Sequence, residues 1–283
     1  MRRRHPAVAG AFYEASRDKL IQRIEWAFKH PIGVGKLPEI SQTRNSRVKL
    51  FISPHAGYMY SGPVASHTYY RIAQGGLPET VIIAGPNHTG MGSLVATTLD
   101  VIWSTPLGDL EVDKEFAKEI MKNSSYLDDD FSAHYSEHSV EVQLPFLQYI
   151  FDNKFKIVPI VLMLQRPEVA RDLAQAIVKA AEKLRRDFIY IASTDWTHYE
   201  PHEVAYKKDI EALKYVENLD TEGFYSYLDS TDHTACGPGP TMIFIELAKL
   251  LKFEKALVLK YATSGDVTGE KDWVVGYAAV TAI

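Results

Sequence analysis

The sequence predicts an α/β fold with a mostly parallel central sheet flanked by helices on both faces. Short apolar, β-branched runs bounded by turn residues recur along the chain, and segments with helical spacing of apolar residues separate them. Because a right-handed crossover between parallel strands needs a helix-length connection, this alternation favours a parallel sheet. The chain has 283 residues, and α/β domains of this length are common, so we expect one domain over residues 1–283.

The predicted strands are buried apolar runs of six to eight residues. They are VKLFIS (48–53), TVIIAG (80–85), FKIVPIVL (155–162), FIYIAS (188–193), ALVLKYA (256–262) and WVVGYAAV (273–280). The predicted helices between them cover 62–73, 113–122, 167–185, 203–217 and 239–251.

Local signals support the helices individually. Pro167 stands at a first-turn position of the 167–185 segment, and Val169, Leu173 and Ile177 repeat at helical spacing behind it. Before the first strand, apolar residues at helical spacing between positions 20 and 28 predict a helix on the same sheet. The Gly- and Pro-rich stretch 31–47 lacks periodicity and is predicted to be an exposed loop.

Composition and charge limit the class of partner. The net charge is -5, and no Lys/Arg block follows Arg4, which argues against binding to nucleic acid or an anionic membrane surface. No run of eighteen apolar residues occurs. The single cysteine, Cys236, cannot form an internal disulfide, so a cytoplasmic location is expected. We therefore expect a small-molecule or peptide ligand, and the oligomeric state stays open.

Three histidines follow three of the predicted strands at the same place. His55 lies in PHAGYMYSG after the first strand, His88 in GPNHTG after the second, and His198 in TDWTHYE after the fourth. Open parallel sheets bind ligands beyond the carboxyl ends of their strands. We expect these side chains to converge on one pocket.

Two imidazoles form a stronger metal site when a third protein ligand joins them. The candidates are Cys236, in TACGPGP before a predicted helix, and Asp195. A helix N-terminus favours a thiolate, and metal coordination would favour it further. The alternative for a single cysteine is a small buried apolar residue.

The segment AHYSEHSVEVQLPF has two interpretations. Glu137, His138 and Glu141 would share a helix face, so the segment is either a helix start capped by Ser136 with a solvated charged face, or a pocket wall. It is not HExxH, so a zincin protease is not supported. The chain also lacks GxSxG and GxxxxGK[ST], which removes the main support for a serine hydrolase or a P-loop nucleotide site.

A set of motifs in register resembles one family. AVAGAFY, SPHAGYMYSGPVA, GPNHTG, EHSVEVQLPFLQ, STDWTHY, ACGPGP and TSGDVTG occur in the order typical of the Memo family, over nearly the whole chain. That family is similar in fold to the class III extradiol dioxygenases of the protocatechuate 4,5-dioxygenase type, which hold one nonheme iron at the end of an α/β sheet. The resemblance implies a single Memo-like domain.

The same resemblance implies roles for individual residues. It places metal ligands at His55, His88 and Cys236, and an acid-base pair at Asp195 and His198, with His198 resembling the catalytic histidine of the dioxygenases. Our own hypothesis adds that Asp195 orients His198 or a bound water. The substrate is expected to contact three further motif residues, Tyr58, Asn87 and His138.

One departure from the dioxygenases matters for the cofactor. They use two histidines and a carboxylate, whereas the resemblance places Cys236 of this chain in the carboxylate position. A thiolate is softer, so the expected cofactor is one metal ion, with iron or copper favoured and zinc as the alternative. The leading hypothesis is a metal-dependent redox enzyme acting on a small aromatic or other small substrate. The alternatives are a non-catalytic metal- or phosphopeptide-binding protein, and a zinc hydrolase with Asp195 as general base.

Overall fold

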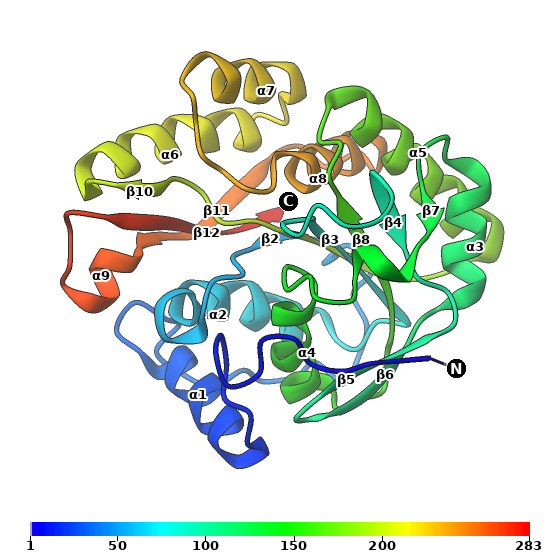
Figure 1. Cartoon of the computed structure of the whole chain (residues 1–283), viewed down its shortest axis with the longest axis horizontal. Coiled ribbons are helices and arrows are strands. Elements are labelled where there is room, and N and C mark those ends of the chain that lie inside the picture. Colours follow the sequence, from blue (N-terminus) through cyan, green and yellow to red (C-terminus); the bar gives the residue numbers. More distant parts are fainter. Residues whose placement is uncertain (1) are drawn as a thin grey trace.

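A nine-stranded sheet occupies the centre of the molecule (Figure 1), in a computed structural model that describes residues 2–283. Its order is β10-β12-β2-β9-β3-β8-β4-β7, and β11 also pairs with β12. The strands of this sheet are β2 (Leu50–Ser53), β3 (Thr80–Pro86), β4 (Val95–Thr97), β7 (Asp128–Asp129), β8 (Lys156–Leu162), β9 (Phe188–Ser193), β10 (His198–Glu200), β11 (Ala256–Thr263) and β12 (Val274–Ala282).

The sheet is mixed rather than mostly parallel. Strands β2, β9, β3 and β8 form a parallel centre, as predicted. On one side β12 is antiparallel to β2, and on the other β4 is antiparallel to β8. Short connections explain these reversals. Strands β11 and β12 are joined only by the short helix α9 (Ser264–Thr268), which cannot carry the chain back across the sheet, so β12 runs antiparallel to β11. Strand β4 likewise follows β3 with no helix between them and runs in the opposite direction. The parallel prediction holds only for the central strands.

Helices cover both faces of the sheet, as predicted. In Figure 1, α1, α2 and α4 lie below the sheet and α6, α7 and α8 lie above it. Helix α2 contacts β2 and β12, while α8 contacts β9, β2 and β3 and packs against α5. The helices are α1 (Arg17–Lys29), α2 (Tyr58–Gly75), α3 (Lys114–Asn123), α4 (Leu144–Phe151), α5 (Pro167–Leu184), α6 (His202–Glu217), α7 (Thr221–Ser230) and α8 (Pro238–Leu250).

The central strands are buried on both faces, which explains their continuous apolar sequences. Every residue of β2, β3 and β9 is buried.

A second sheet of three strands, β1 (Arg2–Arg4), β5 (Val101–Thr105) and β6 (Gly108–Glu111), attaches the N-terminal segment. Within residues 2–283, every helix is too short or too polar to cross a membrane. The result is a mixed α/β fold of one domain whose parallel strands end at a common edge.

Candidate metal centre

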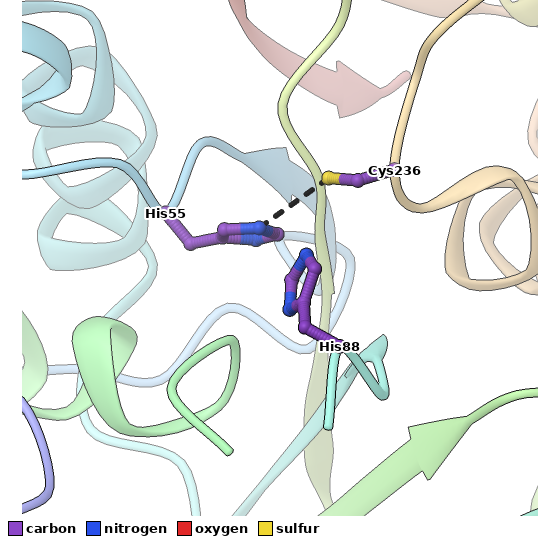
Figure 2. Close-up of side chains that lie close together, drawn as sticks. All are labelled: His55, His88 and Cys236. Carbon is purple, nitrogen blue, oxygen red and sulfur yellow. Dashed lines mark hydrogen bonds between the residues drawn. The ribbon is translucent and has the colours of Figure 1, made fainter. Parts of the chain in front are cut away.

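The carboxyl ends of β2, β3 and β9 bring the predicted site residues to one edge of the sheet. His55 follows β2, His88 follows β3, and Asp195 follows β9, whose Ser193 pairs in parallel with Ser53. Cys236 comes from the loop that precedes α8. Potential ligand atoms of His55, His88 and Cys236 all lie within 4.8 Å of one another, and Figure 2 shows the three side chains turned toward a common point.

His55 is buried and hydrogen-bonded through both ring nitrogens. Its Nδ1 lies 2.9 Å from Ser193 Oγ, and its Nε2 lies 3.4 Å from Cys236 Sγ. Burial holds the pKa of His55 well below its usual value, and the neighbouring imidazoles of His138, His88 and His198 lower it further. The ring is therefore neutral near pH 7, which is the form that binds a metal.

His88 is oriented by a buried carboxylate. Its Nδ1 lies 2.9 Å from Oε1 of Glu137, and its backbone N–H donates to the other oxygen. Because an ionised carboxylate only accepts hydrogen bonds, Nδ1 carries the proton and Nε2 keeps its lone pair. Burial alone would raise the pKa of Glu137, but the hydrogen bonds from His88 and from backbone N–H groups lower it to about 2.

Sequence reasoning missed this role of Glu137. The segment does not start a helix at Ser136: the 3₁₀ turn η2 begins at Glu141 and leads into α4. Glu137 instead accepts the backbone N–H groups of His138 and Ser139, each at 2.8 Å. Both Glu137 and Glu141 are buried, so the solvated-face interpretation is wrong and the segment lines the site. The only local signal was a Glu two residues before the turn at Ser139, and it is a weak one.

Glu137, His88 and His138 also form a second group of ligand-type atoms within 4.8 Å of one another. The Glu137 oxygens already accept four hydrogen bonds, from His88 Nδ1 and from backbone N–H groups. A carboxylate so occupied favours anchoring the loop over ligating an ion of its own.

The Cys236 thiol is held by backbone groups of Asp195. The N–H of Asp195 donates to Sγ at 3.2 Å, and the N–H of Cys236 donates to the Asp195 carbonyl at 3.2 Å. Gln165 fixes the same turn, since its Nε2 donates to the Cys236 carbonyl at 2.9 Å. Burial and the Asp195 carboxylate raise the pKa of this thiol. The predicted thiolate at a helix N-terminus is therefore wrong for the protein alone, and a cation would be needed to ionise the sulfur.

Asp195 and His198 occupy the same edge but are not partners of each other. Oδ1 of Asp195 accepts the backbone N–H of His55 at 2.9 Å. Burial raises the pKa of Asp195 to about 6, against the lowering effect of that backbone donor. The His198 ring is instead oriented by Thr234, whose carbonyl lies 2.9 Å from Nδ1. Since a carbonyl only accepts, Nδ1 carries the proton and Nε2 is free to act as a base.

The three predicted substrate contacts lie in different places. His138 joins the cluster, with its ring stacked on His88 at a centroid distance of 4.5 Å. Asn87 shapes the loop that carries His88, because its side chain accepts from Thr89 and donates to the Met91 carbonyl at 2.8 Å. Tyr58 lies in the core, where its hydroxyl donates to the Val142 carbonyl at 2.6 Å.

Two imidazoles and a thiol at the carboxyl edge of a mixed sheet define this chain as an α/β protein with a candidate mononuclear metal site. A family model described as "Memo-like protein" matches residues 4–281, which is nearly all of the sequence. The chain belongs to the Memo family, as its motifs indicated.

Archaeal relatives support the same assignment. A MEMO1 family protein of Ignicoccus hospitalis is 52% identical over 277 residues, covering 98% of this chain and 97% of its own. One from Sulfurisphaera tokodaii is 52% identical over 279 residues, covering 98% of each chain. Among solved structures, an uncharacterized protein from Escherichia coli K12 aligns with a TM-score of 0.43 and 14% identity, covering 72% of this chain and 86% of its own. That similarity assigns no fold, and the likeness to class III extradiol dioxygenases stays a prediction.

Proposed function

We propose that this protein binds one metal ion through His55, His88 and Cys236 and acts as a metal-dependent redox enzyme on a small aromatic substrate. The observation that carries the proposal is the approach of three ligand atoms to within 4.8 Å of one another. Iron or copper is favoured over zinc, because a thiolate beside two imidazoles is a comparatively soft ligand set.

The donor set fits such an ion. His88 uses Nδ1 to donate to Glu137, so its Nε2 lone pair is available to a metal. The Cys236 thiol has a raised pKa, and metal binding would release its proton. A bound iron or copper ion would supply Lewis acidity and one-electron chemistry at this edge of the sheet.

The remaining side chains of the cluster can move protons and hold a ligand. Nδ1 of His198 donates to the Thr234 carbonyl, and the other ring nitrogen, Nε2, is proposed as the general base. The pKa of Asp195 is raised to about 6, so this carboxyl can hold or release a proton close to neutral pH. His138, stacked on His88, is proposed to contact the substrate. His88 keeps a third of its side-chain surface exposed (34%), which leaves a route for a small molecule.

Oxygen consumption by the reconstituted protein tests the proposal. The protein is loaded anaerobically with Fe(II) or Cu(I), and oxygen uptake is measured with a series of catechols. We expect uptake that depends on metal and is lost in Cys236→Ala and in His198→Ala. His202→Ala is the matched control, because His202 bonds Thr263 outside the cluster at 2.9 Å and should keep both metal and activity.

The outcomes separate the candidate functions. Stoichiometric metal without uptake from any substrate would replace the redox enzyme by a non-catalytic metal- or peptide-binding protein. Binding of neither iron nor copper, with retention of zinc alone, would favour the hydrolase. Absence of all metal would refute the site.

A further inference from the structure

Ser193, the last residue of β9, lies at the centre of a buried hydrogen-bond group behind His55. Its Oγ is 2.9 Å from His55 Nδ1 and 2.6 Å from the Ser139 carbonyl. Nε2 of Gln143 approaches the same oxygen at 2.7 Å. Ser193, Ser139 and Gln143 are all buried, so water does not compete for these bonds.

Counting hydrogens determines the direction of each bond. A serine hydroxyl has one hydrogen and two lone pairs. The Ser139 carbonyl only accepts, so it takes the Ser193 hydrogen. The amide of Gln143 must turn its NH₂ toward Ser193, because the same nitrogen lies 3.0 Å from the Pro54 carbonyl. One lone pair of Ser193 is thus filled by Gln143, and the other accepts from His55.

We propose that Ser193 is a positioning residue that fixes the tautomer of His55, with the proton on Nδ1 and the lone pair on Nε2. The Nε2 atom faces Cys236 Sγ at 3.4 Å, so this tautomer directs the lone pair to the proposed metal position. With the other tautomer, an N–H group would stand there instead. The significance of the lone pair rests on the proposed function, but the tautomer itself does not.

The 137–143 segment positions both imidazoles of the site. Glu137 fixes the proton of His88 on Nδ1, and Ser139 and Gln143 fix that of His55 through Ser193. One short stretch of chain thereby sets the tautomers of both imidazoles. The opposite arrangement, with the Ser193 hydrogen on His55, would leave the buried Ser139 carbonyl without its donor.

Nuclear magnetic resonance of metal-free protein tests the tautomer directly. Protein with ¹⁵N-labelled histidine is examined near pH 7 by long-range ¹H–¹⁵N correlation, and His55→Gln assigns the signal. We expect His55 to be protonated at Nδ1. In Ser193→Ala the acceptor is lost, and we expect the signal to move toward the Nε2–H form. Ser66→Ala is the matched control, because Ser66 is equally buried and donates to the Pro63 carbonyl at 2.7 Å, away from the cluster.

Zinc and cobalt(II) titrations measure the consequence. Loss of an outer partner of a ligating histidine typically weakens metal binding about 10- to 100-fold, and we expect a loss in that range for Ser193→Ala and none for Ser66→Ala. An Nε2–H signal for His55 in the wild-type protein would overturn the proposal. So would a Ser193→Ala protein with an unchanged tautomer. If Ser193→Ala does not fold, the wild-type tautomer decides alone. If the protein binds no metal, the proposed function fails while the tautomer remains measurable.

Discussion

Replacing Glu137 by Gln should weaken both the fold and the metal site. The carboxylate accepts four hydrogen bonds, including His88 Nδ1 at 2.9 Å and the backbone N–H groups of His138 and Ser139 at 2.8 Å. An amide carries the same shape without the charge, and its NH₂ group would face a donor. The amide oxygen would replace Oε1, so Nδ1–H of His88 would keep only a neutral acceptor in place of the carboxylate.

The expected loss follows from the pKa of Glu137. Its ordinary value is 4.5, and the folded protein lowers it to about 2. A difference of about 2.5 in pKa corresponds to about 3 kcal/mol of folding free energy. Because the folded-state pKa is depressed, this contribution is present above about pH 4.5 and is lost as the pH falls toward 2. The side chain is 1% exposed, so solvent screening is minor.

Urea denaturation of metal-free protein at pH 7, with zinc titration of the folded protein, provides the assay. Glu137→Gln should lose about 3 kcal/mol and bind zinc about 10- to 100-fold more weakly. Glu141→Gln is the control: Glu141 is also buried and accepts from Ala7 N at 2.8 Å and Tyr13 Oη at 2.5 Å, without touching an imidazole. It should destabilise the fold but leave zinc affinity intact. Equal zinc affinity in Glu137→Gln and wild type would refute the reasoning.

Two further predictions concern buried groups outside the cluster. Burial lowers the pKa of His134 to about 3 from 6.5, so the unfolded chain takes up a proton that the folded protein excludes, and stability falls as the pH drops below 6.5. Between pH 6.5 and about 4, wild type should lose about 3 kcal/mol more than His134→Leu in urea melts, and parallel pH profiles would contradict this. Asp209 is buried and accepts hydrogen bonds from Thr197 N at 3.1 Å, Thr197 Oγ1 at 2.5 Å and Tyr261 Oη at 2.6 Å. In urea melts Asp209→Asn should therefore cost about 1.5–3 kcal/mol, and the exposed Asp229→Asn should cost nothing measurable.

Much of the architecture is predictable from local pattern. The runs at 80–85 and 188–193 became β3 and β9, and the helix predicted at 167–185 is α5, because burial on both faces and helical periodicity leave direct traces in composition. The placement of His55 and His88 was also accessible, since parallel strands end at one edge of the sheet.

Other features depend on contacts distant in sequence. The charged stretch Arg2–Arg4 becomes a strand only by pairing with Val101–Thr105, which no local propensity indicates. Helix α4 is buried over almost its whole length, Gln148 included, so its sequence LPFLQYIF lacks the period that marks a surface helix. Glu137, the carboxylate partner of His88, lies 49 residues away in the sequence. Composition also did not reveal the short connections that make β4 antiparallel to β8 and β12 antiparallel to β2.

The metal content of protein purified without an affinity tag or chelator tests the central claim most directly. Elemental analysis should find one iron or copper ion per chain in the wild type, and none in His55→Ala or His88→Ala, while His202→Ala retains it. Cys236→Ser should bind more weakly and change its metal preference, because a hydroxyl is a poorer ligand than a thiolate. Metal retained in both histidine variants, or absent from the wild type after reconstitution, would contradict the proposed site.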